Sequence, residues 1–235
     1  MPIEGLEFLF GGAIETIAAF AKGKDEMETR AFRRGQPRPL FVTPAAIILA
    51  SGASTRVEQP KQLLPFDGRP MLAAVIQRYL GAKLSRILVV VDSRATPVAN
   101  LARNFPVHTV LNDYADDGMF SSVQAGLRAM KDGTDVFIGL CDQPLLASET
   151  INRLSAARRT GKGIIIPTHG GRGGHPILIC KRFIPEILSM PVSRMLKDFV
   201  RAHPREVFRL EVADRGVVQD IDDWATYQRE IKRTL

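Results

Sequence analysis

The chain has 235 residues, 45% hydrophobic and 24% charged, which is enough for one sizeable core with an appendage. Its net charge of +7 suits an anionic small molecule. Nucleic acid and membranes are not expected partners, because the sequence has no Lys/Arg-dense helix with interleaved aromatics and no apolar stretch of about eighteen residues.

Residues 1–43 differ in character from the rest. They hold equal numbers of basic and acidic side chains, so the positive excess lies wholly in residues 44–235. A signal peptide is not convincing there, because the first charges are Glu4 and Glu7 and no basic segment precedes the apolar part. We interpret this extension, with its linker-like stretch 30–39, as a docking or self-association element or as simple disorder.

From residue 44 onward, predicted strands alternate with predicted helices. Strands are expected at 45–50, 86–92, 107–111, 135–141, 163–167, 176–180 and 206–212, and helices at 70–81, 95–103, 120–131, 149–160 and 223–233, with further helical segments before the last strand. This order predicts an α/β domain over residues 44–235, with a doubly wound, mostly parallel sheet in a three-layer α/β/α arrangement. Ligands bind such sheets at the carboxyl ends of the strands.

The first motif follows the first strand, where residues 49–64 are L-A-S-G-A-S-T-R-V-E-Q-P-K-Q-L-L. A loop of small residues lets backbone N–H groups approach an anion, and Arg56 and Lys61 can close over it, which is typical of a triphosphate site. The alternative is an ordinary strand-to-helix turn with solvated cations. The candidate nucleotide-binding residues here are Leu49, Ala50, Ser51, Gly52, Ser54, Arg56 and Lys61.

A second motif, N-D-Y-A-D-D-G-M-F-S-S-V-Q-A-G-L, starts at Asn112 after the third strand. Ser121 and Ser122 fall in the first turn of the predicted helix, where hydroxyls and free N–H groups can bond a base or ribose. Asn112 and Gly118 are candidates for the same site, and pure helix capping by the serines is the alternative.

Acidic residues occur at two later points. Strand 135–141 ends in Asp142-Gln143-Pro144, and the stretch 220–223 is D-I-D-D. Carboxylates suit Mg²⁺, which is bound by one or two of them together with substrate phosphates. The alternatives are a turn at Asp142 and a helix cap at Asp222 or Asp223. A glycine-rich loop with Gly174, His175 and Pro176 enters the strand at 176–180, and a flexible hairpin connection is its competing interpretation.

Taken in order over about residues 45–227, these motifs resemble the molybdopterin cytidylyl- and guanylyltransferase family, whose loop is L-A-A-G-x-S-x-R-M-G-x-x-K. This chain departs from it at Ser51, Val57 and Glu58. Glu58 opposes the ligand's charge unless it points away. The resemblance implies the Rossmann-like fold of nucleotide-diphospho-sugar transferases. The G-M-F-S-S sequence at 118–122 is typical of the cytidylyl branch and favours CTP over GTP.

The resemblance also implies a chemistry, in which an acceptor phosphate, expected to be that of molybdopterin, attacks the α-phosphorus of the nucleoside triphosphate and releases pyrophosphate. It implies these site residues: Arg56, Lys61 and Asp142 as catalytic, Asp142 and Asp220 (Asp222 possible) on Mg²⁺, and Gly174, His175, Pro176 and Arg194 on the acceptor side. The family's G-D-x-G-A-R element is replaced by S-M-P-V-S-R at 189–194.

Two further interpretations stay open. One is nucleotidyl transfer to another phosphate, such as a sugar 1-phosphate or phospholactate. The other is a non-catalytic maturation factor that docks on a molybdoenzyme through residues 1–43.

Both cysteines end apolar runs and are far from any C-x-x-C spacing. We expect Cys141 and Cys180 to be buried thiols in a reducing, cytoplasmic compartment, and not a disulfide or a metal site. The four histidines also lack metal-ligand spacing.

Overall fold

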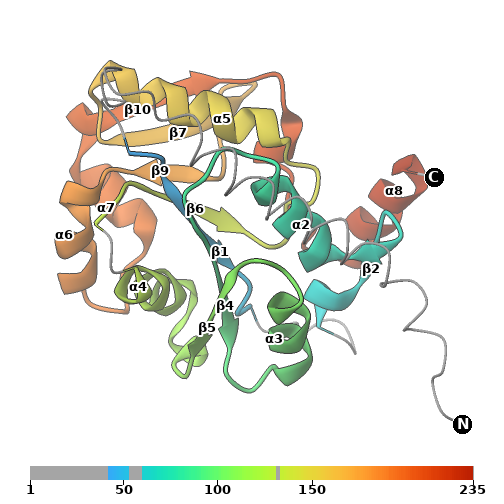
Figure 1. Cartoon of the computed structure of the whole chain (residues 1–235). Helices are drawn as coiled ribbons and strands as arrows, with labels where there is room; N and C mark the ends of the chain where they lie inside the picture. Colours follow the sequence, from blue (N-terminus) through green and yellow to red (C-terminus); the bar gives the residue numbers. More distant parts are fainter. Residues whose placement is uncertain (1–41, 53–59, 131–132, 235) are drawn as a thin grey trace, which may run out of the picture. The chain divides into compact units, whose positions relative to one another are not determined.

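The structure is a computed structural model that describes residues 42–52, 60–130 and 133–234. Its centre is one sheet with the strand order β10-β7-β9-β6-β1-β4-β5, to which β8 is added as a partner of β7 (Figure 1). The strands are β1 (Ala45–Leu49), β4 (Ile87–Asp92), β5 (His108–Asn112), β6 (Val136–Leu140), β7 (Ile164–His169), β8 (Arg172–Gly173), β9 (Ile177–Ile179) and β10 (Val207–Glu211).

Helices cover both faces of this sheet. They are α2 (Met71–Leu80), α3 (Thr96–Arg103), α4 (Met119–Ala129), α5 (Ser148–Ala156), α6 (Ile184–Ser189) and α7 (Leu196–Ala202). The last helix, α8 (Trp224–Thr234), packs through Tyr227 in a separate cluster. Ala46 and Ile48 of β1 pack in one core cluster with residues of α2, α3 and α5, whereas Ile47 and Leu49 pack in the other with residues of α4, α6 and α7. This alternation explains the uninterrupted apolar strand, because side chains on both faces are buried. The predicted three-layer α/β/α fold is confirmed.

The order of the predicted strands and helices is also confirmed, with boundaries that differ by one or two residues. The largest difference is the helix expected at 149–160. The α-helix α5 ends at Ala156, and the 3₁₀-helix η3 (Ala157–Thr160) continues it to Gly161, whose φ is 75°. Glycine adopts this left-handed conformation without a steric penalty, so it ends the helix.

A small hairpin, β2 (Pro65–Phe66) with β3 (Arg69–Pro70), was not predicted. Asp67 and Gly68 form its turn with φ of 51° and 71°. The Asp-Gly pair is the sequence signal for such a turn. Phe66 packs with Ile221 and Tyr227 in a third core cluster. This cluster anchors the C-terminal acidic stretch beside the start of α2, although the two segments are far apart in the sequence.

Strand β9 runs antiparallel to both of its neighbours, β6 and β7, whereas β1, β4, β5 and β6 are mutually parallel along the sheet. The loop that enters β9 therefore lies at the same edge as the carboxyl ends of the parallel strands. In the part of the chain that the structure describes, no helix is long and apolar enough to cross a membrane.

Candidate active site

The turn after β1 is held by a side chain from outside the turn. Gln62, in the 3₁₀-helix η1 (Lys61–Leu63), donates from Nε2 to Ala50 O at 2.9 Å and to Gly52 O at 3.0 Å. Ser51 Oγ donates to Val90 O of β4 at 3.1 Å. Among the described residues, no atom lies within 4 Å of a Cβ added at Gly52. Gln62 was not among the predicted site residues, although its side chain fixes the backbone where an anion is expected.

The predictions for Ser54, Arg56 and Glu58 fall outside the described residues. The docking or self-association role of residues 1–43 also concerns a segment that is outside them except for its last two residues. All of these stay predictions.

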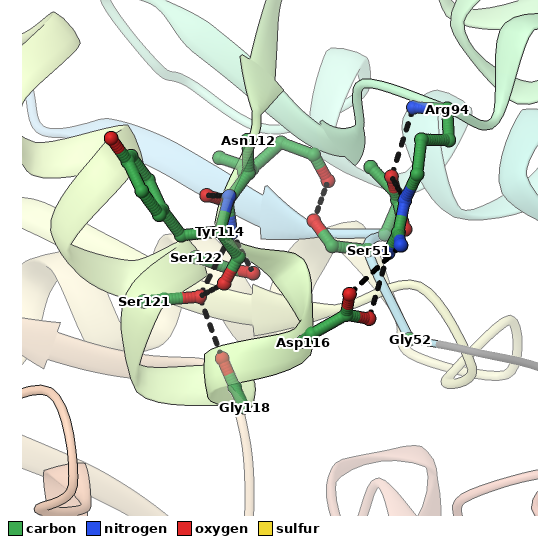
Figure 2. Close-up of polar contacts among 12 residues, drawn as sticks. Ser51, Gly52, Arg94, Asn112, Tyr114, Asp116, Gly118, Ser121 and Ser122 are labelled. Atoms are coloured by element: carbon green, nitrogen blue, oxygen red, sulfur yellow. Dashed lines mark hydrogen bonds and ion pairs between the residues drawn. The ribbon is translucent and has the colours of Figure 1, made fainter.

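Between β5 and α4, side chains of the second motif bond to one another (Figure 2). Asn112 Nδ2 donates to Ser121 Oγ at 2.9 Å and to Ser122 Oγ at 3.0 Å, and Asn112 Oδ1 accepts from Tyr114 N at 3.0 Å. Ser121 Oγ lies 2.7 Å from Tyr114 O and 2.8 Å from Gly118 O. These buried groups hold the loop against α4, which begins after Gly118 with its φ of 94°. Contact of the two hydroxyls with a base or ribose stays a prediction.

Arg94 joins two loops at this edge and was not expected as a site residue. Its guanidinium bonds Asp92 at the end of β4 and Asp116 in η2 (Ala115–Asp117), with N–O distances of 2.7 Å to each (Figure 2). Hydrogen bonds from Arg94 lower the pKa of both aspartates. Arg94 and Asp116 are exposed, so the pairing contributes little to stability and mainly sets the position of the loop.

At the carboxyl end of β6, one cation lies between two carboxylates. Lys61 Nζ is 2.7 Å from Asp142 Oδ2 and 2.8 Å from Asp222 Oδ1. Burial by itself lowers the pKa of Lys61. The negative charge and the hydrogen bond of Asp142 outweigh this effect, with a smaller contribution from Asp222, so the pKa of Lys61 lies above its usual value. Burial raises the pKa of Asp142, with Lys61 opposing the shift. The structure thus brings together three predicted site residues that are far apart in the sequence.

The other predicted metal ligand lies on the same side. Asp220 Oδ1 accepts from Gln143 Nε2 at 2.7 Å, and the peptide N–H of Ile221 bonds Asp142 O at 2.9 Å. The alternative that Asp222 caps the last helix is wrong, since Asp223 Oδ1 accepts from Thr226 N at 2.7 Å in the first turn of α8, while Asp222 pairs with Lys61.

The carboxylates fit a hard divalent cation that is bound partly by the protein and partly by a substrate. Asp142 Oδ1 is buried and has no hydrogen-bond partner among the described residues, which is costly unless a ligand satisfies it. In the same described ranges, no group of three or more His, Cys, Asp or Glu side chains could hold a metal ion by itself. Asp142 and Asp220 therefore suit Mg²⁺, whose remaining ligands would be water and phosphate oxygens.

The structure places the predicted acceptor residues in two separate segments, one before β9 and one between α6 and α7. Gly174, His175 and Pro176 lead into β9, and His175 N donates to Val217 O at 2.8 Å. A Cβ on Gly174 would lie 1.8 Å from that same oxygen, so only glycine fits. Burial lowers the pKa of His175, with Asp220 opposing the shift. Arg194 is exposed in the turn between α6 and α7, and among the described residues no hydrogen bond or ion pair joins it to the carboxylates.

Both cysteines are free, as predicted. Cys141 is buried, and burial raises the pKa of its thiol. Cys180 is only half-buried.

Comparison with known protein families gives a match that covers more than half of the chain. The model of the family described as MobA-like NTP transferase domain matches residues 46–207. Two curated relatives are each 28% identical to the chain. One is nicotine blue oxidoreductase of Paenarthrobacter nicotinovorans, aligned over 75% of this chain and 90% of the relative. The other is molybdenum cofactor cytidylyltransferase of Escherichia coli K12, aligned over 75% and 89%.

Among solved structures, the chain is similar to Rv0371c from Mycobacterium tuberculosis H37Rv. The TM-score is 0.70 at 22% identity, and the match covers 81% of this chain and 99% of that one. A second structure of Rv0371c, a complex with manganese, gives a TM-score of 0.67 with the same identity and coverage. At this identity the likeness supports the fold.

Proposed function

We propose that this chain, which belongs to the MobA-like NTP transferase family, transfers CMP from Mg²⁺-CTP to the phosphate of a molybdopterin-type acceptor and releases pyrophosphate. Nucleotidyl transfer is the activity of this family. The identities of the nucleotide, the acceptor and the metal are what we propose beyond this activity.

The observation that carries the proposal is the arrangement at the end of β6. Asp142 has one oxygen paired with Lys61 and the other buried without a partner among the described residues, and Asp220 lies beside it. A closed structural ion pair would satisfy both oxygens. An oxygen left open next to a second carboxylate is instead what a cation completed by a substrate phosphate requires.

Little covalent work falls to the protein in this reaction, so its residues mainly align two anions and balance charge. The turn at Ser51 and Gly52 presents backbone to the triphosphate, with Gln62 holding its shape. Lys61 contributes a permanent positive charge beside the reacting phosphates. Asp142 and Asp220 would hold Mg²⁺, which when bound neutralises phosphate charge.

We assign the two substrates to different halves of the edge. Asn112 to Ser122 border the nucleotide half, where the G-M-F-S-S sequence supports CTP. Gly174 to Pro176 border the acceptor half, next to Val217 and Asp220.

Pyrophosphate release, measured with each of CTP, GTP, ATP and UTP in the presence of molybdopterin and Mg²⁺, tests the proposal. We expect release with CTP above the other three. Faster release with GTP would overturn the base assignment alone, and release only with a sugar 1-phosphate or phospholactate would overturn the acceptor.

The oxidoreductase among the relatives makes a hydride-transfer assay a necessary second arm. Oxidation or reduction of nicotine blue, and no pyrophosphate release with any acceptor, would overturn nucleotidyl transfer. Nucleotide binding with neither activity would favour the maturation factor.

A further inference from the structure

Gln143 is a nearly fully buried polar side chain between the two proposed metal ligands. It is 1% exposed and follows Asp142 directly. Its Nε2 donates to Asp220 Oδ1 at 2.7 Å and to Val217 O at 3.2 Å. One amide therefore connects the end of β6 to the segment that carries Asp220.

The orientation of this amide is set by its partners. Both neighbours are hydrogen-bond acceptors, so a flipped amide would place its oxygen against two oxygens. In the observed orientation Gln143 Oε1 is buried and has no partner among the described residues. Burying an unsatisfied oxygen costs about 1–3 kcal/mol. The two donated bonds outweigh that cost, which indicates that the side chain serves as a double donor.

The segment that Gln143 holds is packed tightly against its loop. A Cβ on Gly216, in η6 (Arg215–Val217), would lie 2.6 Å from the backbone of Leu145. Val217 O accepts a second bond, from His175 N. The backbone before Asp220 is thus fixed, whereas Asp220 itself is exposed. Its carboxylate needs a partner to keep one orientation.

We propose that Gln143 is a positioning residue that holds the Asp220 carboxylate toward the metal, an inference that rests on the proposed function. Carboxylates that ligate metals are commonly oriented by such a hydrogen bond, and removal of the bond typically costs 10–100-fold in metal affinity. Without Gln143 the exposed Asp220 side chain rotates freely, and it must be ordered again when the metal binds.

Binding of Mn²⁺, followed by the electron paramagnetic resonance signal of the free ion, tests this on the full chain. It is measured with Mn²⁺ alone and with saturating α,β-methylene-CTP. The variants are Gln143→Met, which keeps the length but removes the donor, Gln143→Glu, which places a second carboxylate against Asp220, and Asp220→Asn. Thermal unfolding of each variant is measured in parallel.

Gln124→Met is the matched control. Gln124 is a buried amide that likewise donates two bonds from Nε2, to Ile187 O at 3.0 Å and Met190 O at 2.8 Å, but it joins α4 to α6. We expect this variant to lose stability and keep its Mn²⁺ affinity.

For Gln143→Met we expect about a 10-fold or greater rise in the Mn²⁺ dissociation constant, and for Gln143→Glu a larger rise, with folding retained in at least one of them. If Asp220→Asn weakens Mn²⁺ binding and neither Gln143 variant does, the positioning role is wrong and the metal assignment stands. If wild type binds no Mn²⁺, or Asp220→Asn binds it as wild type does, the metal assignment falls and takes this inference with it.

Discussion

The two halves of the site edge, one around Asn112 and the other around Asp142, differ in how their buried polar atoms are hydrogen-bonded. Around Asn112 the buried amide and the two serine hydroxyls bond one another and the loop. Around Asp142 two buried oxygens, Asp142 Oδ1 and Gln143 Oε1, have no partner in the described part of the chain. Buried polar groups that only hold shape are usually satisfied, so the unpaired charged oxygen of Asp142 is the atom at which a ligand is expected.

An unpaired polar atom alone does not mark a ligand site. The hydroxyl of Tyr79 is also buried and without a partner among the described residues, yet it lies in the core against Gly139. What distinguishes Asp142 is charge, a second carboxylate and a position at the carboxyl edge of the sheet.

The largest effect is expected for Asp142→Asn, which keeps the shape of the side chain and removes its charge. Loss of one such electrostatic contact typically lowers the rate by about 10²-fold or more. Pyrophosphate release and thermal unfolding are measured together. The control is Asp116→Asn, a change to an aspartate in the other half that pairs with Arg94. An Asp142→Asn protein that keeps most of its activity would contradict the proposed metal site.

Gly174→Ala tests the tight packing of the acceptor half. Its new Cβ would lie 1.8 Å from Val217 O, which is backbone and cannot move aside alone. We expect the free energy of unfolding to fall by about 1–3 kcal/mol, as in other overpacked sites. Gly173→Ala is the matched control, because among the described residues its Cβ would approach the flexible end of Arg209 at 3.1 Å and Ile166 Cγ2 at an ordinary contact distance of 3.5 Å, and no backbone atom. Equal stability of both variants in chemical denaturation would refute this account.

Ser121→Ala and Ser122→Ala sharpen the interpretation of the nucleotide half. Ser121 Oγ has contacts with Asn112, Tyr114 and Gly118, so its loss should lower the free energy of unfolding by about 1 kcal/mol, and loss of Ser122 by less. Denaturation and CTP titration are compared for both variants. A Ser122→Ala protein of unchanged stability that binds CTP more weakly would show that this hydroxyl contacts the nucleotide.

The smallest effect concerns the pH dependence at His175. Because burial lowers its folded pKa below the usual 6.5, the unfolded chain binds more protons as the pH falls below that value. Stability contributed by neutral His175 is therefore full above about pH 6.5 and is lost on acidification, with a slope of at most about 1.4 kcal/mol per pH unit. Asp220, which faces the ring, reduces the effect. His175→Gln should make the unfolding free energy less dependent on pH between 5 and 7, and identical slopes would disprove it.

The sequence predicted the layered fold well because strands buried on both faces and alternating with helices leave few possible topologies. It also predicted the neighbourhood of Lys61, Asp142 and Asp220, since their motifs all follow strands that end at one edge. It did not predict that Lys61 pairs with Asp222, because that contact joins residues 161 positions apart and no local pattern announces it.

Gln62, Arg94 and Gln143 were missed for a different reason. Each acts by bonding a backbone oxygen or a carboxylate brought near by folding, and an amide or guanidinium carries no pattern in the sequence that says so. The D-Q-P sequence at Asp142 to Pro144 contained a signal for Gln143, but its partners became visible only in three dimensions.

The antiparallel course of β9 also bears on how such chains can diversify. Two parallel neighbours have to be joined by a long crossover, whereas β7 and β9 are antiparallel neighbours joined by a hairpin connection. That connection can lengthen, shorten or be exchanged between related chains without disturbing the strand order or the helices. A graft has to keep Gly174, which fits against Val217. Under the proposed function, replacement of this one connection is expected to change the choice of acceptor and to leave the loop between β5 and α4 as it is.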